Sequence, residues 1–283
     1  MQVASPIELA TSVTKSRTFF CQLRWRGRRT CPRCGHRKLY SLNSGQIKCK
    51  ACGYKFRDFT GTYVGKLRIP LDVVSHLLYL FVLGVPAYRM RWYVPVSLAT
   101  IEKTLRTFRQ AIYGAAMEEL NVLRLSGELE LDEAMFGGHR KGKRGWGAHG
   151  KHVVFGIYQR GGQVITFPVP DRKWQTLLPL IERHTEAGSV YYTDDFHGYV
   201  ALEMRGKHER VTHKRDEYVR GGTHLNGIEG FWSFAKTWLY HYRGVPRDYF
   251  AFYLKEIEFR FNHRHQDLFP LVAQLVVKLV PDR

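Results

Sequence analysis

The chain has 283 residues, enough for one large domain or two smaller ones with a sizeable hydrophobic core. Lys and Arg number 44 against 25 Asp and Glu, which gives a formal net charge of +19. This charge argues against an enzyme of small neutral metabolites, because such a chain repels itself without an anionic partner. Nucleic acid is the first partner to consider, and an anionic membrane surface is the alternative.

The start of the chain lacks the features of a secretory signal. Met1 to Ala10 has no basic segment followed by an apolar one. The longest apolar run, Val73 to Val85, is shorter than the roughly 20 residues that a spanning helix needs. We therefore expect a soluble, cytoplasmic protein that associates with the nucleoid and has no membrane partner.

Residues 1–60 are expected to form a short helical lead-in and a zinc ribbon. Two Cys-x-x-Cys-Gly turns contain Cys31, Cys34, Cys49 and Cys52. Each turn points two thiolates at one ion, so the two turns together predict a tetrahedral, structural Zn²⁺ site. The residues between the turns alternate like a hairpin. A redox-active Cys-x-x-Cys is the weaker alternative, because the motif is duplicated and no βαβ pattern surrounds it.

Basic residues crowd this ribbon. They are Arg24, Arg26, Arg28, Arg29, Arg33, Arg37 and Lys38. On a zinc ribbon in so basic a chain we expect DNA contact, with Arg28, Arg29 and Arg33 foremost, although a solvated charged face is the simpler alternative. Cys21 stands apart from the cysteine pairs and is expected to be a packed thiol.

Residues 66–125 are expected to be helical. Pro70 to Leu83 has apolar residues at intervals of three and four, and a second helix is predicted from Ser97 or Thr100, either of which is a suitable N-cap, to about Leu120. This pattern suits a helix-turn-helix whose second helix presents basic residues to DNA, and it suits an ordinary pair of antiparallel helices equally well. The basic residues are Lys103, Arg106 and Arg109.

Residues 126–283 change to strands and then return to helices. The predicted strands are 128–136, 151–159, 163–169, 189–193 and a short one at 210–213, with a helix at 174–184 before the fourth. This order is typical of a ribonuclease-H-like α/β fold. A glycine-rich basic loop follows the first strand, and it either contacts DNA through charge and stacking or is disordered. Its candidate DNA-binding residues are Arg140, Lys141, Lys143, Arg144 and Trp146.

Acidic residues stand where a metal-dependent phosphoryl-transfer site needs them. Asp132 and Asp194 each end an apolar strand, so both carboxylates emerge at one edge of the sheet if these strands are parallel neighbours. On the helix that follows, Asn226, Glu229 and Lys236 share one face. Such oxygen ligands predict Mg²⁺ or Mn²⁺, with Glu229 the better third ligand because it is charged. Lys236 either contacts DNA phosphate or is a solvated or ion-paired lysine.

The chain resembles the IS1595-type insertion-sequence transposases, a branch of the DDE superfamily, over nearly its whole length. The resemblance is carried by Cys31–Gly35, Glu130–Glu133, Phe136–Gly138, Val190–Asp194, His224–Ser233 and Glu258–Arg264. It implies a ribonuclease-H-like catalytic domain that uses divalent metal to cut and rejoin DNA at the ends of a mobile element. The family's first two acids match Asp132 and Asp194. Its third position matches Asn226 or Glu229, and the lysine that follows matches Lys236.

The resulting hypothesis is a DNA transposase, expected to act as a homo-oligomer because two element ends must be brought together. A non-catalytic DNA-binding regulator derived from a transposase is the main alternative. A nuclease that cleaves DNA without joining it to a target is a third possibility.

Overall fold

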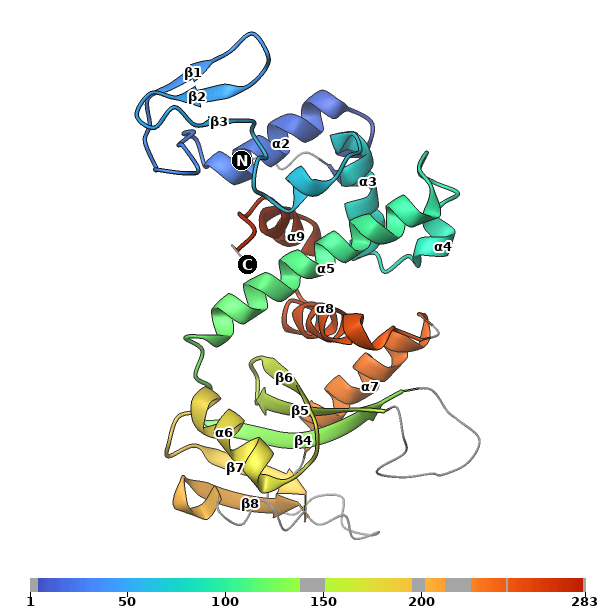
Figure 1. Ribbon diagram of the computed structural model, residues 1–283. Helices are drawn as coiled ribbons and strands as arrows, with labels where there is room; N and C mark the ends of the chain where they lie inside the picture. Colours follow the sequence, from blue (N-terminus) through green and yellow to red (C-terminus); the bar gives the residue numbers. More distant parts are fainter. Residues whose placement is uncertain (1–4, 138–150, 195–201, 212–224, 243, 282–283) are drawn as a thin grey trace. The chain divides into compact units, whose positions relative to one another are not determined.

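The structure is a computed structural model that describes residues 5–137, 151–194, 202–211, 225–242 and 244–281 (Figure 1). The chain divides into two compact units. The first comprises residues 1–115 and 265–283, and the second comprises residues 116–264. Within the described ranges, no helix combines the length and the apolarity that crossing a bilayer demands.

The first unit combines a small three-stranded sheet with helices. Its elements are α1 (Pro6–Ala10), α2 (Val13–Trp25), β1 (Leu39–Ser41), β2 (Ile47–Cys49), β3 (Lys55–Phe56), the 3-10 helix η1 (Val64–Lys66), α3 (Leu71–Val82), α4 (Ala87–Met90), most of α5 (Leu98–Leu120) and α9 (Leu268–Val276). The three strands are antiparallel in the order β1-β2-β3. The predicted hairpin is therefore confirmed and gains a third strand.

Two long helices of the first unit, α2 and α5, begin at serine side-chain caps. The Ser12 hydroxyl accepts a hydrogen bond from the Lys15 backbone N–H and starts α2, and the Ser97 hydroxyl accepts one from Thr100 and starts α5. The predicted Ser97 cap is thus confirmed. The last helix joins this unit through aromatic packing, because the rings of Phe19 and Phe269 stack at 5.9 Å. Residues far apart in the sequence therefore share this core.

The second unit is a five-stranded mixed sheet with helices on both faces. Its elements are β4 (Glu128–Phe136), β5 (His152–Gln159), β6 (Val164–Val169), α6 (Trp174–His184), β7 (Val190–Asp194), β8 (Lys207–Val211), α7 (Asn226–Tyr240), the 3-10 helix η3 (Arg247–Tyr249) and α8 (Phe250–Asn262). The strand order is β6-β5-β4-β7-β8. β5 runs antiparallel to both of its neighbours, β6 and β4. β4, β7 and β8 run parallel to one another.

Alternation along β4 assigns its two faces to two cores. Leu129 and Leu131 face α6 and the end of α5, whereas Ala134 and Phe136 pack with α7 and α8. Figure 1 shows α6 on one side of the sheet and α7 on the other. The predicted elements of this unit are confirmed with small shifts at their ends. The exception is the last strand, which begins at Lys207, three residues before its predicted start.

Side chains of α8 cover the outer edge of β6. The Asn262 amide donates to the Val164 carbonyl and accepts from the Val164 N–H, both at 2.9 Å. Glu258 accepts from the Thr166 N–H and hydroxyl, and Lys255 donates to the Thr166 carbonyl. Lys255 and Glu258 are themselves a buried ion pair at 2.7 Å. A helix thus satisfies backbone groups that a further strand would otherwise bond.

Candidate metal centres

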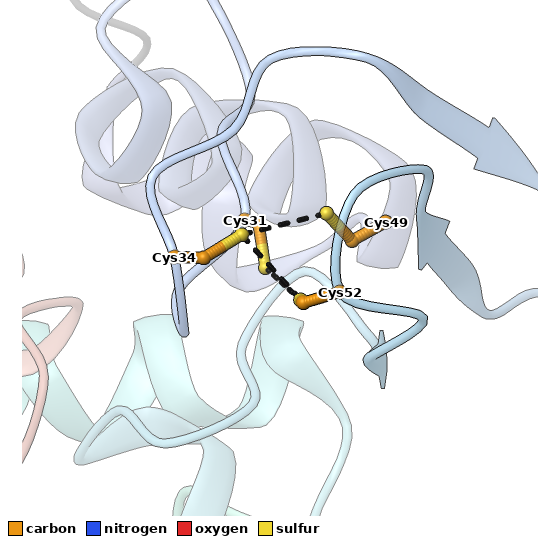
Figure 2. A group of neighbouring side chains, drawn as sticks. All are labelled: Cys31, Cys34, Cys49 and Cys52. Carbon is orange, nitrogen blue, oxygen red and sulfur yellow. Dashed lines mark hydrogen bonds between the residues drawn. The ribbon is translucent and has the colours of Figure 1, made fainter.

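Four cysteines converge in the first unit, at the turns that flank the small sheet (Figure 2). Their Sγ atoms all lie within 4.8 Å of one another. Individual separations are 3.7 Å for Cys31 and Cys52, 3.6 Å for Cys34 and Cys49, and 3.4 Å for Cys34 and Cys52. A tetrahedral zinc ion with Zn–S bonds of about 2.3 Å needs sulfurs about 3.8 Å apart. The four thiols therefore fit one Zn²⁺.

The backbone of each turn prepares the thiols for a cation. Gly35 and Gly53 both adopt left-handed φ values, 71° and 69°, and donate to the carbonyls of Cys31 and Cys49. Backbone N–H groups of Cys52 and Ala51 point at the Cys49 thiol and lower its pKa to about 7. Because the thiolate is the form that ligates metal, this turn favours binding near neutral pH.

Two of the predicted acids meet on neighbouring parallel strands of the second unit. Glu130 of β4 pairs with Tyr192 of β7, and the same register two residues further on brings Asp132 level with Asp194. Burial, and then the negative charges of Glu133 and Asp194, raise the pKa of Asp132 to about 7. A partly buried carboxylate beside a second acid favours a bound cation, because the cation removes the repulsion between the two negative charges.

Asp132 is held from α7. The indole N–H of Trp232 donates to Asp132 Oδ2 at 3.0 Å, and the indole itself is buried against the sheet. This hydrogen bond opposes the rise in the pKa of Asp132. The helix that carries the predicted third ligand is therefore tied to the first acid.

A buried carboxylate on β4 fixes the N-terminal end of α7. Glu130 is only 1% exposed, and its Oε2 accepts from the Ile228 backbone N–H at 2.8 Å. Its Oε1 accepts from Arg160 Nε at 2.9 Å, and the guanidinium lies over the Tyr192 ring. A carboxylate at a helix N-terminus satisfies a free N–H and interacts favourably with the helix dipole. Glu130 thereby fixes where α7 starts relative to Asp132.

Two glycines allow this close approach of α7 to the sheet. A Cβ on Gly156 of β5 would lie 2.7 Å from the Trp232 ring. A Cβ on Gly227 of α7 would overlap the Tyr158 ring and lie 3.0 Å from Glu130 Oε2. Any side chain at either position would push α7 away from the strand that carries Asp132.

Asp194 lies beside a second ion pair. Arg172 binds the buried Glu133 at 2.9 Å through Nη2, and the same nitrogen is 3.9 Å from Asp194 Oδ2. Arg172 therefore lies closer to Glu133 than to Asp194. The side chain of Asp194 is 34% exposed, so Asp194 is more accessible than the buried Glu133. Asp195, its sequence neighbour, lies outside the described residues.

The faces of α7 are segregated as predicted. Ile228, Phe231, Trp232 and Ala235 are buried, and Leu239 is partly buried against the same core. The polar residues Asn226, Glu229, Ser233 and Lys236 are exposed on the other side. In the described ranges, the cysteines are the one group of three or more potential metal ligands gathered closely enough to share an ion. The structure therefore places Asp132 beside Asp194, whereas Glu229 does not complete a close group of three acids with them.

The predicted DNA-binding arginines have different environments. Arg28, Arg33 and Arg106 are exposed, whereas Arg29 binds the buried Asp58 at 2.9 Å. Arg109, which the helix-turn-helix alternative placed among the basic residues of its second helix, is buried with its guanidinium 5.5 Å from the Phe81 ring and so does not face solvent. The basic-loop residues Arg140, Lys141, Lys143, Arg144 and Trp146 lie outside the described residues. Cys21 is partly buried, as expected, and burial raises the pKa of its thiol.

Sequence reasoning missed the supports of Asp132. A faint signal for Glu130 exists, since the acids at 128, 130 and 132 alternate with the leucines at 129 and 131 and so share one face of the strand. Nothing comparable identifies Trp232, which the helical pattern places simply in the core. Its hydrogen bond depends on how α7 crosses the sheet.

Two transposase domain families match this chain, one over the zinc ribbon and one over the mixed sheet. The ISXO2-like transposase domain family matches residues 124–262, and the transposase zinc-ribbon domain family matches residues 14–55. A transposase-like protein of Haemophilus influenzae is 37% identical over 102 residues, which cover 36% of this chain and 82% of that protein. The chain belongs to the ISXO2-like, or IS1595-type, transposase family.

A second relative extends the similarity over most of the chain. A protein from the transposable element ISH50 of Halobacterium salinarum is 26% identical over 278 residues, which cover 90% of this chain and 92% of that protein. The family assignment therefore applies to both the ribbon and the mixed sheet.

Proposed function

We propose that this ISXO2-like transposase catalyses divalent-metal-dependent cleavage and strand transfer at the ends of an insertion sequence. The observation that carries the proposal is the pair of acids on adjacent parallel strands, with Asp132 partly buried and held by Trp232. The family match supplies the reaction class. The order β6-β5-β4-β7-β8, with three antiparallel strands followed by two parallel ones, supports assigning the sheet to the ribonuclease-H-like fold.

In this proposal the chain's own residues create the metal site. Asp132 and Asp194 hold the cation, and Glu229 or Asn226 supplies a third oxygen from α7. A bound Mg²⁺ or Mn²⁺ would lower the pKa of a nucleophilic water or hydroxyl and offset charge on the scissile phosphate. Trp232 orients Asp132, and Glu130 holds α7 in register with β4. Lys236, exposed on the polar face of α7, contacts a DNA phosphate.

The remaining segments are proposed to bind DNA. Arg28 and Arg33 of the ribbon, Arg106 of α5 and the basic loop supply cations for the phosphate backbone. A helix-turn-helix formed by α3 and α5 stays a prediction. Residues 83–97 join the two helices, and this connection is longer than the usual three- or four-residue turn of that motif. A homo-oligomer on chromosomal DNA in the cytoplasm is the expected working form.

The proposal is tested with the purified full chain and a duplex that carries the terminal repeats of its own locus. With Mg²⁺, native protein should cleave and join this DNA, whereas Asp132→Ala and Asp194→Ala should lose both steps by at least about 100-fold while still binding the duplex. Glu182→Ala, an exposed acid on the opposite helix α6, is the matched control. Cleavage retained in either aspartate variant would refute the assignment.

The same assay separates the alternatives. A non-catalytic regulator would bind the repeats without cleavage and would be indifferent to Asp132→Ala. A nuclease would cleave without a joined product. Comparing Asn226→Ala with Glu229→Ala for Mg²⁺ affinity identifies the third ligand, and the charge of Glu229 favours a larger loss for its variant.

A further inference from the structure

The segment between α3 and α5, which includes α4 (Figure 1), contains three exposed aromatic residues. Tyr88, Trp92 and Tyr93 are 55%, 74% and 64% exposed, so three large rings stand in solvent within six residues of chain. None of the roles assigned above uses them. Exposed apolar surface of this size within one short segment is a reason to look for a binding partner.

The backbone beneath these rings is fixed. Met90 is fully buried and Val94 nearly so, which anchors the segment on both sides of Trp92. The N–H groups of Trp92 and Tyr93 donate to the carbonyls of Arg89 and Met90 at 3.2 and 2.9 Å. The exposed rings therefore project from an ordered turn, and a ligand would not have to order it first.

Cations accompany the rings. The guanidinium of Arg91 lies 4.5 Å from the centre of the Trp92 ring, and that of Arg89 lies 5.8 Å from the Tyr88 ring. No Asp or Glu occurs between Asp72 and Glu102. A second copy of this cationic surface would repel the first, so self-association does not explain it, whereas an anionic ligand with flat faces fits it.

We propose that Tyr88, Trp92 and Tyr93 form a stacking platform for unpaired bases of single-stranded DNA, with Arg89 and Arg91 binding the adjacent phosphates. Aromatic faces accept any base, and cations beside them track the backbone, which is the general chemistry of single-strand binding. Paired bases in a duplex expose only their edges, so the platform discriminates against double-stranded DNA. The choice of DNA as the ligand rests on the proposed function, but the binding itself needs neither metal nor cleavage.

The test measures binding of the zinc-loaded full chain to a labelled short oligothymidine and to a blunt duplex, without added Mg²⁺. Trp92→Ala and Tyr88→Ala are each expected to weaken oligothymidine binding by roughly tenfold, the usual effect of removing one stacking partner of a base. Duplex affinity should change less than about twofold. Tyr240→Ala, which removes another exposed ring (80%) on α7, is the matched control and should change neither.

A double variant tests the role of the two arginines in phosphate binding. Replacing Arg89 and Arg91 by Gln should lower the salt dependence of oligothymidine binding by about 0.7 in the log–log slope for each phosphate that is no longer neutralised. An unchanged thermal midpoint in every variant establishes that the fold persists, as expected for exposed side chains. Oligothymidine affinity within about twofold of native in both aromatic variants, or an equal loss for duplex, overturns the proposal. Because no cleavage is involved, a chain that fails as a transposase still gives a decisive result.

Discussion

The zinc ribbon and the acid pair are both built from residues that repel one another when ionised, but they are assembled in opposite ways. The four cysteines come from two short turns within residues 31–52 and lie beside a small sheet whose hydrophobic core consists of a few side chains, including Ile47 and Phe56. Asp132 and Asp194 are separated by a helix and two strands, and the five-stranded sheet brings them together. We therefore expect the local cysteine motif to depend on its metal for folding, whereas the long-range acid pair is assembled by the sheet itself.

The largest expected effect comes from removing zinc. Cys49→Ser should abolish zinc binding and unfold β1 to β3, because zinc contributes about 10 to 16 kcal/mol to the folding of comparable small domains. The sheet of the second unit should remain folded. Hydrogen exchange of residues 39–56 and 128–169 measures the two regions separately.

A matched control is available for this experiment. Cys21→Ser alters the one cysteine outside the cluster and should keep both zinc and ribbon. Exchange that rises equally in both regions of Cys49→Ser would contradict the contrast between a metal-dependent and a metal-independent centre.

A smaller loss is expected from the buried carboxylate that positions α7. Glu130→Ala leaves the Ile228 N–H without its acceptor and Arg160 without its buried partner, which should cost about 3 to 5 kcal/mol of unfolding free energy. Glu128→Gln is the control, because Glu128 is 53% exposed and 3.6 Å from Arg160, and an exposed pair contributes about 1 kcal/mol or less. Denaturant unfolding of both variants gives the comparison, and equal losses would show that Glu130 has no special role.

The pH dependence of stability tests the acid pair directly. Since burial and neighbouring acids raise the pKa of Asp132 to about 7, its stabilising contribution is complete below the unfolded value of 3.8 and is lost as pH rises through 7. Asp132→Asn should therefore be more stable than native protein by about 2 to 4 kcal/mol above neutral pH and nearly equal to it in acid.

Adding Mg²⁺ above neutral pH extends this measurement. The thermal midpoint of native protein should rise, because the cation binds the folded state, whereas that of Asp132→Asn should not. Glu182→Gln should behave like native protein in both conditions. A native midpoint that is independent of pH and Mg²⁺ would separate Asp132 from any metal site.

The smallest effects should come from two glycines of α7, with opposite signs. Gly227→Ala places a methyl group against Tyr158 and should destabilise the fold by about 1 to 3 kcal/mol. Gly230→Ala meets nothing within 4 Å and should stabilise the helix by up to about 1 kcal/mol. Thermal midpoints of the two variants give the signs, and a shared sign would mean that close approach to the sheet does not constrain α7.

Much of this architecture could be predicted from the sequence. The duplicated Cys-x-x-Cys-Gly turns predict the ribbon because both turns are local, and the apolar periodicities predict α3, α5, α6 and the five strands of the larger sheet. They did not locate β3, α4, α8 or α9. Pattern reasoning placed both acids at the ends of strands, which is correct for Asp194 of β7 but wrong for Asp132, which lies in the middle of β4. The structure makes the two strands parallel neighbours, as the prediction required. The contacts around Asp132 could not be predicted, because Trp232 and Glu130 depend on the crossing of α7 over β4. The burial of Arg109 was missed for the same reason, since a basic residue on a helix gives no sign of which neighbour covers it.

The edge of β6 has a consequence for how copies of this transposase can associate. Asn262 and Glu258 already bond the outward N–H groups of Val164 and Thr166, so an incoming strand from another chain would find those donors taken. The sheet cannot lengthen on that side by adding a strand from a second subunit. Association of two copies of this chain by strand addition is therefore blocked at this edge, and an oligomer would have to use other surfaces.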